Sequence, residues 1–399
     1  MDIRSRLGLR PVINVSGTMT SLGASSVAAP VIEAVAEILP QFVEIDDLQR
    51  KASAAIATAC GSEAGYVTAS CSAAITLTIA ATMTGDDPGL IERLPHTSGL
   101  RNKVAVQTGH LVNYGAPIDQ AIRLAGAHAV PVGAATEAHG YQLAAAIDEH
   151  TTAALYVVSH HTVGYGLIPL EEFIEVAHRQ GVPVIVDAAS EYDLKRFIAA
   201  GADLALYSAH KFLGGLTAGV VAGNKALVRA AYFQNAGIGR GMKVGKEGIA
   251  GAIAALEQWQ QRDHVAVRAR ERGYLSSWEQ ALNRLPGVRA QIEADPTGNP
   301  LERLKISLDP RDARTTAWDL ADALAHPRDG SQPVIVRDHE VELHYFFLDP
   351  CNLHPGEAPV VQARIVAELQ HARDAREPLV TPFHQRDARR TAARRNWPD

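Results

Sequence analysis

The chain has 399 residues, 47% of them hydrophobic and 21% charged, which is the composition of an ordinary globular protein. Because a single hydrophobic core stops growing near ~250–300 residues, this length predicts a large domain and a smaller one. The formal net charge of −6 disfavours nucleic acid as a partner. Three cysteines are too few for a disulfide framework, and no apolar run resembles a signal peptide or approaches the ~18 residues that span a membrane. We therefore expect a cytoplasmic protein with no membrane partner.

Residues 1–45 predict an irregular N-terminal arm with a helix near Ala29–Ile38. From about Asp46 to Leu227, short β-branched runs alternate with amphipathic windows, which predicts an α/β domain over residues 46–260 with a mainly parallel seven-stranded sheet. The expected strands are Tyr66–Thr68, Val104–Gln107, Ala127–Val132, Ala153–Val158, Val184–Val186, Leu204–Tyr207 and Gly219–Ala222. The expected helices are Ser72–Thr84, Ile118–Ala125, Tyr141–Asp148, Leu170–Gln180 and Asp193–Ala199, four of them followed by Gly85, Gly126, Gly181 or Gly201.

A long helix over Lys246–Leu282 is expected to lead out of the sheet domain. Residues 261–399 then predict a smaller α+β domain, with strands at Leu304–Leu308, Val334–Val336 and Val341–Phe347 and a helix at Pro359–His371. The arginine-rich C-terminus is expected to be a solvated tail or a frayed last helix.

A carboxylate ends the buried run Val184–Val186, since Asp187 follows it directly. Side chains at the carboxyl end of such a strand point into the crevice where α/β proteins bind ligands. There Asp187 can pair with a protonated pyridine nitrogen. A helix N-cap is the competing interpretation of Asp187 alone.

A lysine follows the next buried run in the segment Ser208-Ala-His210-Lys211, which leads into the glycines Gly214 and Gly215. Glycines at this point let the backbone approach a ligand closely. A desolvated lysine becomes a nucleophilic amine suited to Schiff-base formation. Ser208 and His210 flank it and can donate hydrogen bonds to a phosphate.

Small residues at Ser70, Cys71 and Ser72 join the first strand to its helix, where exposed N–H groups can bind a phosphate. His110 follows the second strand and is a candidate to stack on a planar ring. Ser159 and His161 follow the fourth strand and are candidates for the ring oxygen and the substrate. No third ligand has a spacing that suits zinc, so we expect no metal.

Together, Asp187 and the Ser-x-His-Lys segment resemble the signature of fold-type I pyridoxal-phosphate enzymes. The segments Arg10–Gly23, Leu48–Lys51 and Gly239–Glu247 further resemble the selenocysteine-synthase-like group, in particular its short members similar to D-glucosaminate-6-phosphate ammonia-lyase. The resemblance implies pyridoxal 5'-phosphate as cofactor, bound to Lys211 as a Schiff base, with Asp187, His210 and Lys211 as catalytic residues.

The resemblance also implies a lyase that removes a β-hydroxyl and then ammonia from a small hydroxylated amino acid. A racemase or epimerase is the leading alternative and an aldolase comes third. Selenocysteine synthase itself must bind a large tRNA, which the acidic balance disfavours. Leu111 and Gly115 depart from the basic and acidic residues of the lyase-like members, which weakens the expectation of a sugar-phosphate substrate.

Substrate contacts are expected from two further segments, the N-terminal arm and the basic run that ends at Lys246. In the fold-type I class the active sites lie between subunits, so we expect a homodimer or a larger even assembly. Apolar groups in the arm would be covered by the partner. The candidate substrate-binding residues are Asn14, Thr18, Thr20, His161, Arg240 and Lys243.

Overall fold

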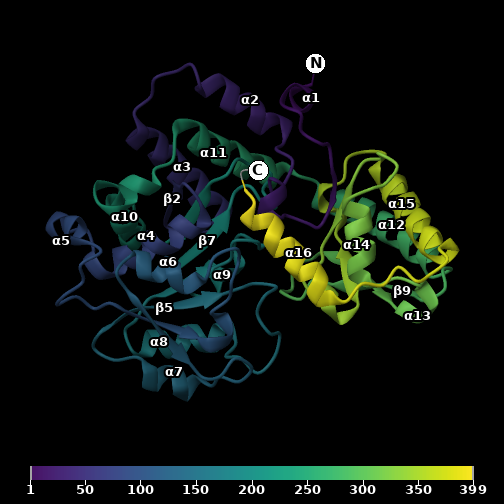
Figure 1. Ribbon diagram of the computed structural model, residues 1–399. Helices are drawn as coiled ribbons and strands as arrows, with labels where there is room; N and C mark the ends of the chain where they lie inside the picture. Colours follow the sequence, from purple (N-terminus) through teal and green to yellow (C-terminus); the bar gives the residue numbers. More distant parts are fainter. Residues whose placement is uncertain (1, 398–399) are drawn as a thin grey trace. The chain divides into compact units, whose positions relative to one another are not determined.

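The computed structural model describes residues 2–397, which form two compact units (Figure 1). The larger unit spans residues 25–262, and the smaller one joins the first 24 residues to the segment from residue 263 onward. The expected arm of residues 1–45 is therefore divided between the two units. Among the described residues, no helix combines the length and the apolar character needed to cross a membrane.

The larger unit contains the predicted seven-stranded sheet, in the order β2-β8-β7-β6-β5-β3-β4. Every neighbouring pair is parallel except the two that involve β8, which is antiparallel to both β2 and β7. The mainly parallel α/β architecture is thus confirmed. The strands are β2 Ala64–Thr68, β3 Lys103–Gln107, β4 His128–Val132, β5 Thr151–Val157, β6 Val184–Asp187, β7 Leu204–Ser208 and β8 Gly219–Gly223.

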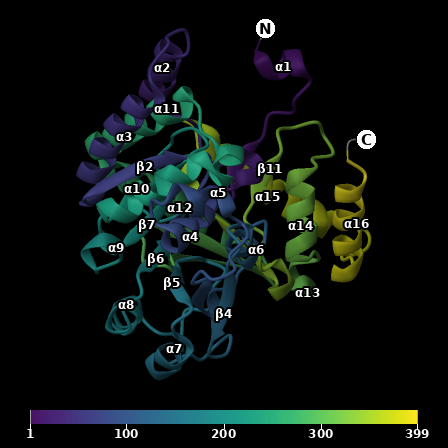
Figure 2. The same ribbon diagram turned by 90° about the vertical axis from the view of Figure 1, so that its left-hand side faces the viewer.

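Helices connect these strands, and α4 is the most deeply buried of those in the larger unit. Twelve of its fourteen residues are buried, because α4 contacts five strands as well as α6 and α10 (Figure 2). The helices are α2 Ala29–Ile38, α3 Ile45–Cys60, α4 Cys71–Thr84, α5 Pro88–Arg93, α6 Ile118–Leu124, α7 Gly140–Ala146, α8 Leu170–Arg179, α9 Arg196–Ala199, α10 Lys225–Phe233 and α11 Lys246–Gln261. The four predicted glycines all have positive φ.

The predicted helix over Lys246–Leu282 is wrong as a single element. It is interrupted at Arg262–Asp263, where the side chain of Asp263 accepts a hydrogen bond from the N–H of Ala266 at 2.9 Å and caps a second helix. The predicted strand Val341–Phe347 is also wrong at its start. Val341–Leu343 form a 3-10 turn that ends at His344 in the left-handed region, so the strand begins only at Tyr345.

The smaller unit has a two-stranded sheet, β1-β11, and a three-stranded antiparallel sheet, β12-β10-β9. Within the predicted arm, Ile13 and Val15 of β1 are buried in the core of this unit, so the chain itself covers them. The elements are α1 Ile3–Leu7, β1 Ile13–Val15, α12 His264–Leu282, β9 Val288–Ala294, β10 Glu302–Leu308, α13 Pro310–Ala313, α14 Ala317–Ala325, β11 Val334–Val336, β12 Tyr345–Leu348, α15 Glu357–Asp374 and α16 Phe383–Arg395.

The C-terminal basic segment is a helix, α16, rather than a solvated tail. Arg386 is buried, and its guanidinium donates to Asp322 at 2.9 Å and to Asp338 at 2.6 Å. Arg390 lies one turn further and also donates to Asp338, at 2.7 Å. Two ion pairs on a buried arginine fix this helix to the smaller unit.

A buried ion-pair cluster lies under the three-stranded sheet. Arg303 of β10 contacts Asp295 and Asp349, both at 2.8 Å, and all three side chains are less than one tenth exposed. The charge of Asp349 and that of Asp295 raise the pKa of Arg303, although burial acts against them. Arg303 thus forms ion pairs with two buried carboxylates, and the charge of Arg337 also acts on both of them.

We expect Arg303→Ala to lower the free energy of unfolding by about 3–5 kcal/mol, because it removes the guanidinium that forms ion pairs with both buried carboxylates. The matched control is Arg272→Ala, which removes an exposed ion pair with Glu302, the residue next to Arg303. That control should cost about 1 kcal/mol or less. Urea unfolding of both variants measures the difference, and equal losses would contradict it.

Candidate active site

The predicted site residues follow strands that run in one direction. Because β8 is antiparallel to β2 and β7, strands β2, β3, β5, β6 and β7 all end at the same edge of the sheet. The register places Val157 at the end of β5 beside Asp187 at the end of β6. This edge is where open α/β sheets bind ligands. The residues that follow these ends are Ser70, Cys71, Ser72, His110, Ser159, Asp187, Ser208, His210 and Lys211.

Asp187 is buried, with 7% of its surface exposed. Its Oδ1 accepts hydrogen bonds from the N–H of Ala189 at 3.1 Å and from the Sγ of Cys71 at 3.5 Å. Burial raises the pKa of Asp187, although the charge of Lys211 and both hydrogen bonds act in the opposite direction. The carboxylate is thus short of positive charge in the protein alone.

Lys211 lies in a tight turn after β7. Its N–H donates to the carbonyl of Ser208 at 3.2 Å, and the N–H of Gly215 closes the turn on the carbonyl of Ala209 at 2.8 Å. A Cβ at Gly215 would lie 2.9 Å from the Cβ of Ala255 and 3.0 Å from that same carbonyl oxygen, so the close packing favours glycine there. The positive charge of Lys211 acts on Asp187, Cys71 and His210, so its amine lies within electrostatic range of all three.

His210 is 9% exposed, and its Nδ1 is buried with no hydrogen-bond partner among the described residues. Burial, and then the charge of Lys211, lower the pKa of His210, so its ring is neutral. The Ser25 hydroxyl donates to the carbonyl of His210 at 2.6 Å and fixes the backbone. Buried polar atoms are almost always paired in native proteins, so an unpaired Nδ1 beside Lys211 indicates a position that a ligand completes.

His110 is fixed by the end of β5. Its Nδ1 accepts a hydrogen bond from the N–H of Val157 at 3.1 Å, and its ring meets Tyr156 edge to face at 4.5 Å between centroids. Burial lowers the pKa of His110 to about 4. The ring is therefore neutral, with its proton on Nε2, and it is anchored to the residue that pairs with Asp187.

Ser70, Cys71 and Ser72 form the N-terminus of α4. The Oγ of Ser70 caps the helix by accepting the N–H of Ala73 at 3.1 Å. Cys71 is buried, and burial followed by the charge of Asp187 raises the pKa of its thiol well above the ordinary value. The Cys71 thiol contacts Asp187 at 3.5 Å, and the sequence did not predict this contact.

Tyr114 belongs to the same cluster, although its sequence context gives it no expected role there. Its Oη lies 2.9 Å from the Oγ of Ser72. Burial raises the pKa of Tyr114, and the charges of Asp187 and Cys71 add to the effect, although the bond to Ser72 opposes it. The loop around Tyr114 has no periodic pattern, and its closeness to His110 in the sequence is the one signal that points to it.

The predicted substrate contacts come from other parts of the chain. Asn14, Thr18 and Thr20 belong to the smaller unit, where Asn14 donates to the backbone carbonyl of Gly17 at 3.0 Å. In the larger unit, Arg240 and Lys243 are exposed around a 3-10 turn.

After β5, Ser159 is half-buried and His161 is exposed, and the N–H of His161 donates to the Oγ of Ser159 at 3.2 Å. Within residues 2–397, no group of three or more His, Cys, Asp and Glu side chains is placed to hold a metal ion.

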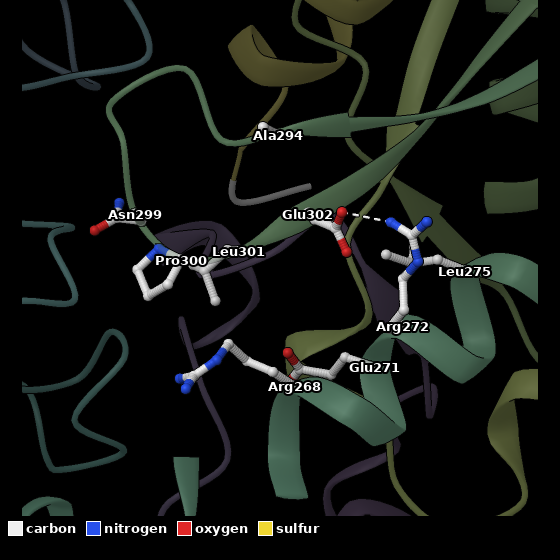
Figure 3. A pocket seen from close by; sticks show the side chains of 9 residues that line it. All are labelled: Arg268, Glu271, Arg272, Leu275, Ala294, Asn299, Pro300, Leu301 and Glu302. Atoms are coloured by element: carbon white, nitrogen blue, oxygen red, sulfur yellow. Dashed lines mark hydrogen bonds and ion pairs between the residues drawn. The ribbon is translucent and has the colours of Figure 1, made fainter. Parts of the chain in front are cut away.

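A separate pocket of about 290 Å³ lies wholly in the smaller unit and contains none of the predicted residues. Figure 3 shows Arg268 and Glu271 on α12 facing the loop that carries Asn299, while Arg272 is paired with Glu302. Side chains of both signs of charge line this pocket.

The buried His110 predicts a pH dependence of stability. The pKa of His110 falls from 6.5 to about 4 on folding. Between these two pH values the histidine is therefore neutral in the folded protein but protonated in the unfolded chain. The contribution of His110 to the free energy of unfolding, about 3 kcal/mol in total, is therefore fully present above pH 6.5 and is lost as the pH falls toward 4. His110→Gln keeps an acceptor for Val157 but does not titrate, so its urea stability should fall less on acidification. Identical pH slopes in the two proteins would contradict this assignment.

Comparison with known proteins places the chain in a family. The sequence pattern of the L-seryl-tRNA selenium transferase family matches residues 12–284. A D-glucosaminate-6-phosphate ammonia lyase from Salmonella typhimurium (strain 14028s / SGSC 2262) is 37% identical over 94% of this chain and 99% of its own length. A 5'-C-glycyluridine monooxygenase-decarboxylase from Streptomyces sp is 34% identical over 92% of each chain.

Solved structures agree with this placement. A structure of D-glucosaminate-6-phosphate ammonia-lyase matches with a TM-score of 0.83 at 37% identity, covering 94% of this chain and all of that one. An aspartate aminotransferase from Thermus thermophilus, at 17% identity and a TM-score of 0.54, covers 92% of this chain and 93% of its own and shares the fold. The chain belongs to the L-seryl-tRNA selenium transferase family and is a pyridoxal-phosphate enzyme of fold type I.

Proposed function

We propose that the protein is a pyridoxal-phosphate-dependent ammonia lyase that acts on a small hydroxylated amino acid. The observation that carries the proposal is the buried Asp187 beside the Lys211 amine, on a chain similar to an ammonia lyase over 94% of its length. The residues present fit the cofactor, because they offer a carboxylate short of positive charge, an amine, an unpaired His210 Nδ1 and a helix N-terminus.

When bound, pyridoxal phosphate supplies an electron-withdrawing ring that stabilises negative charge at the substrate Cα. Asp187 would hold a proton on the ring nitrogen, and the cation created there would offset the cost of burying the carboxylate. Lys211 would bind the cofactor covalently and, once displaced by the substrate amine, take the Cα proton. The neutral His210 would hold cofactor or substrate by a hydrogen bond at Nδ1.

The reaction would remove the β-hydroxyl as water and, after addition of water, release ammonia and a 2-oxo product. The water lost in elimination is returned in hydrolysis, so the net change is loss of ammonia. We propose His110 as the ring-stacking residue and Ser159 and Ser208 as further cofactor contacts. Asn14, Thr18, Thr20, His161, Arg240 and Lys243 remain the proposed substrate contacts.

The experiment that tests the reaction is a screen of D- and L-β-hydroxy amino acids, sugar amino acids and their phosphates. Release of ammonia with a 2-oxo acid supports the lyase. Loss of optical rotation without ammonia would instead indicate a racemase, and cleavage to an aldehyde would indicate an aldolase. Carbon dioxide release that consumes oxygen would indicate the reaction class named for the Streptomyces relative.

Lys211→Ala should abolish covalent cofactor binding and lower turnover by several orders of magnitude, because nucleophile and base are lost together. Lys225→Ala, an exposed lysine at the start of α10, is the matched control and should be fully active. Borohydride reduction followed by peptide mapping identifies the labelled lysine. A label on another lysine would refute the assignment.

Asp187→Asn should retain the fold but lower turnover by about 10²–10³, since the electrostatic support of the ring is lost. Because the pKa of Asp187 is raised in the cofactor-free protein, its charged form costs stability, and that cost grows as the pH rises past the ordinary carboxyl pKa. The cofactor-free variant should therefore be at least as stable as the wild type at neutral pH.

The control for Asp187 is Asp193→Asn. The Oδ1 of Asp193 accepts hydrogen bonds from the N–H groups of Lys195 and Arg196, so this carboxylate only caps a turn. If Asp187 were merely a cap, both variants would keep near wild-type turnover and lose similar stability.

We also propose a homodimer or a larger even assembly. Apolar side chains are exposed along residues 32–42 of the larger unit, where Ile32 is 55%, Leu39 51% and Phe42 fully exposed. Light scattering should give at least twice the 42.7 kDa of one chain. Leu39→Ser combined with Phe42→Ser should weaken the assembly, whereas Val265→Ser, at an apolar residue that is 72% exposed elsewhere on the chain, should not. A fully active species of single-chain mass would exclude shared active sites.

A further inference from the structure

Two hydroxyl groups meet at the N-terminus of α4. Ser72 is the second residue of this helix, and its Oγ lies 2.9 Å from the Oη of Tyr114, which comes from the loop between β3 and α6. The N–H groups of Cys71 and Ser72 have no intrahelical acceptor, as in the first turn of any helix. Donors from two segments far apart in the sequence thus converge on one point.

The loop holds Tyr114 by its own hydrogen bonds. The side chain of Asn113 accepts the N–H of Gly115 at 3.0 Å, and Asn113 forms a backbone bridge with Pro117. Gly115 has a φ of +119°, which favours glycine, and a Cβ there would meet nothing within 4 Å. Tyr114 as a whole residue is 38% exposed, so it lies at the open side of the cluster rather than in the core.

Positive charge is scarce around this point. Among the described residues 2–397, Lys211 is the one cation whose charge acts appreciably on Asp187, His210 or Tyr114. That amine is committed to the cofactor's aldehyde, so it cannot also neutralise a phosphate. Within one chain, a dianionic group bound here would rely on N–H and O–H donors and on the helix dipole.

We infer that Tyr114 is a cofactor-binding residue, which donates its phenolic hydrogen to the phosphate of pyridoxal phosphate together with Ser72. In the free protein the hydroxyls of Ser72 and Tyr114 form a hydrogen bond with each other. When a phosphate oxygen is bound between the two hydroxyls, both can donate to it. Because burial raises the pKa of Tyr114, the phenol keeps its proton and remains a donor at neutral pH. The inference concerns the cofactor alone and does not depend on which reaction follows.

The test compares pyridoxal phosphate with pyridoxal, which lacks the phosphate. Cofactor-free wild type, Tyr114→Phe and Ser72→Ala are titrated with each compound. Tyr114→Phe should bind pyridoxal phosphate about 10- to 100-fold more weakly, the effect of losing one hydrogen bond to a charged group, and pyridoxal equally well. In the double variant the losses should be less than additive, because the two hydroxyls contact each other. Tyr141→Phe, an exposed tyrosine on α7, is the control.

Two readouts separate this role from a structural one. The phosphorus NMR signal of bound cofactor should shift in Tyr114→Phe and not in Tyr141→Phe. Inorganic phosphate should raise the melting temperature of cofactor-free wild type more than that of Tyr114→Phe. Because this measurement uses cofactor-free protein, it applies even if the variant binds little cofactor. If Tyr114→Phe bound pyridoxal and pyridoxal phosphate with equally reduced affinity, Tyr114 would contact the cofactor ring or support the fold, and the inference would be overturned. Unchanged affinity for both compounds would overturn it as well.

Discussion

The site is organised around a buried carboxylate whose charge the protein leaves incompletely compensated. Asp187 stands at the end of a central strand, and its Oδ1 receives one backbone N–H and one thiol. Taking a carboxylate out of water costs several kcal/mol unless a cation and hydrogen bonds offset it. A ligand that brings a cationic nitrogen to Asp187 lowers this cost. The buried carboxylate therefore destabilises the free protein but favours binding of such a ligand. Lys211 and Cys71 act directly on this carboxylate, and the charge of Lys211 also acts on His210.

Much of this edge of the sheet could be predicted because its elements follow simple rules. Buried strands are recognisable as short β-branched runs, and parallel strands bring their carboxyl ends together, so the sequence alone predicts that Asp187 and Lys211 lie at one edge. The contact between Cys71 and Asp187 could not be predicted in the same way. It depends on how α4 enters the sheet, and a small residue at a helix start suits many roles.

The same distinction applies to Tyr114 and to the smaller unit. Tyr114 lies on a loop whose course is set by Asn113 and Gly115, and loop geometry carries no periodic signal. In the smaller unit, β9 has the apolar and polar alternation of a half-buried strand, but two of its apolar residues are Ala290 and Ala294, which have little preference for strands. The break at Arg262–Asp263 was masked by good helix formers on both sides, although Asp263 is a standard N-cap.

The pairing of β1 with β11 has a consequence for how the chain is made. Ile13 pairs with Val334, so an N-terminal strand must wait for a partner more than three hundred residues later. At ~5–20 residues per second, a ribosome needs roughly 15 to 65 seconds to supply it. The larger unit is one continuous stretch, residues 25–262, and can complete its sheet meanwhile. Until β11 emerges, the backbone of β1 lacks its strand partner, and its unpaired N–H and C=O groups can pair with another strand.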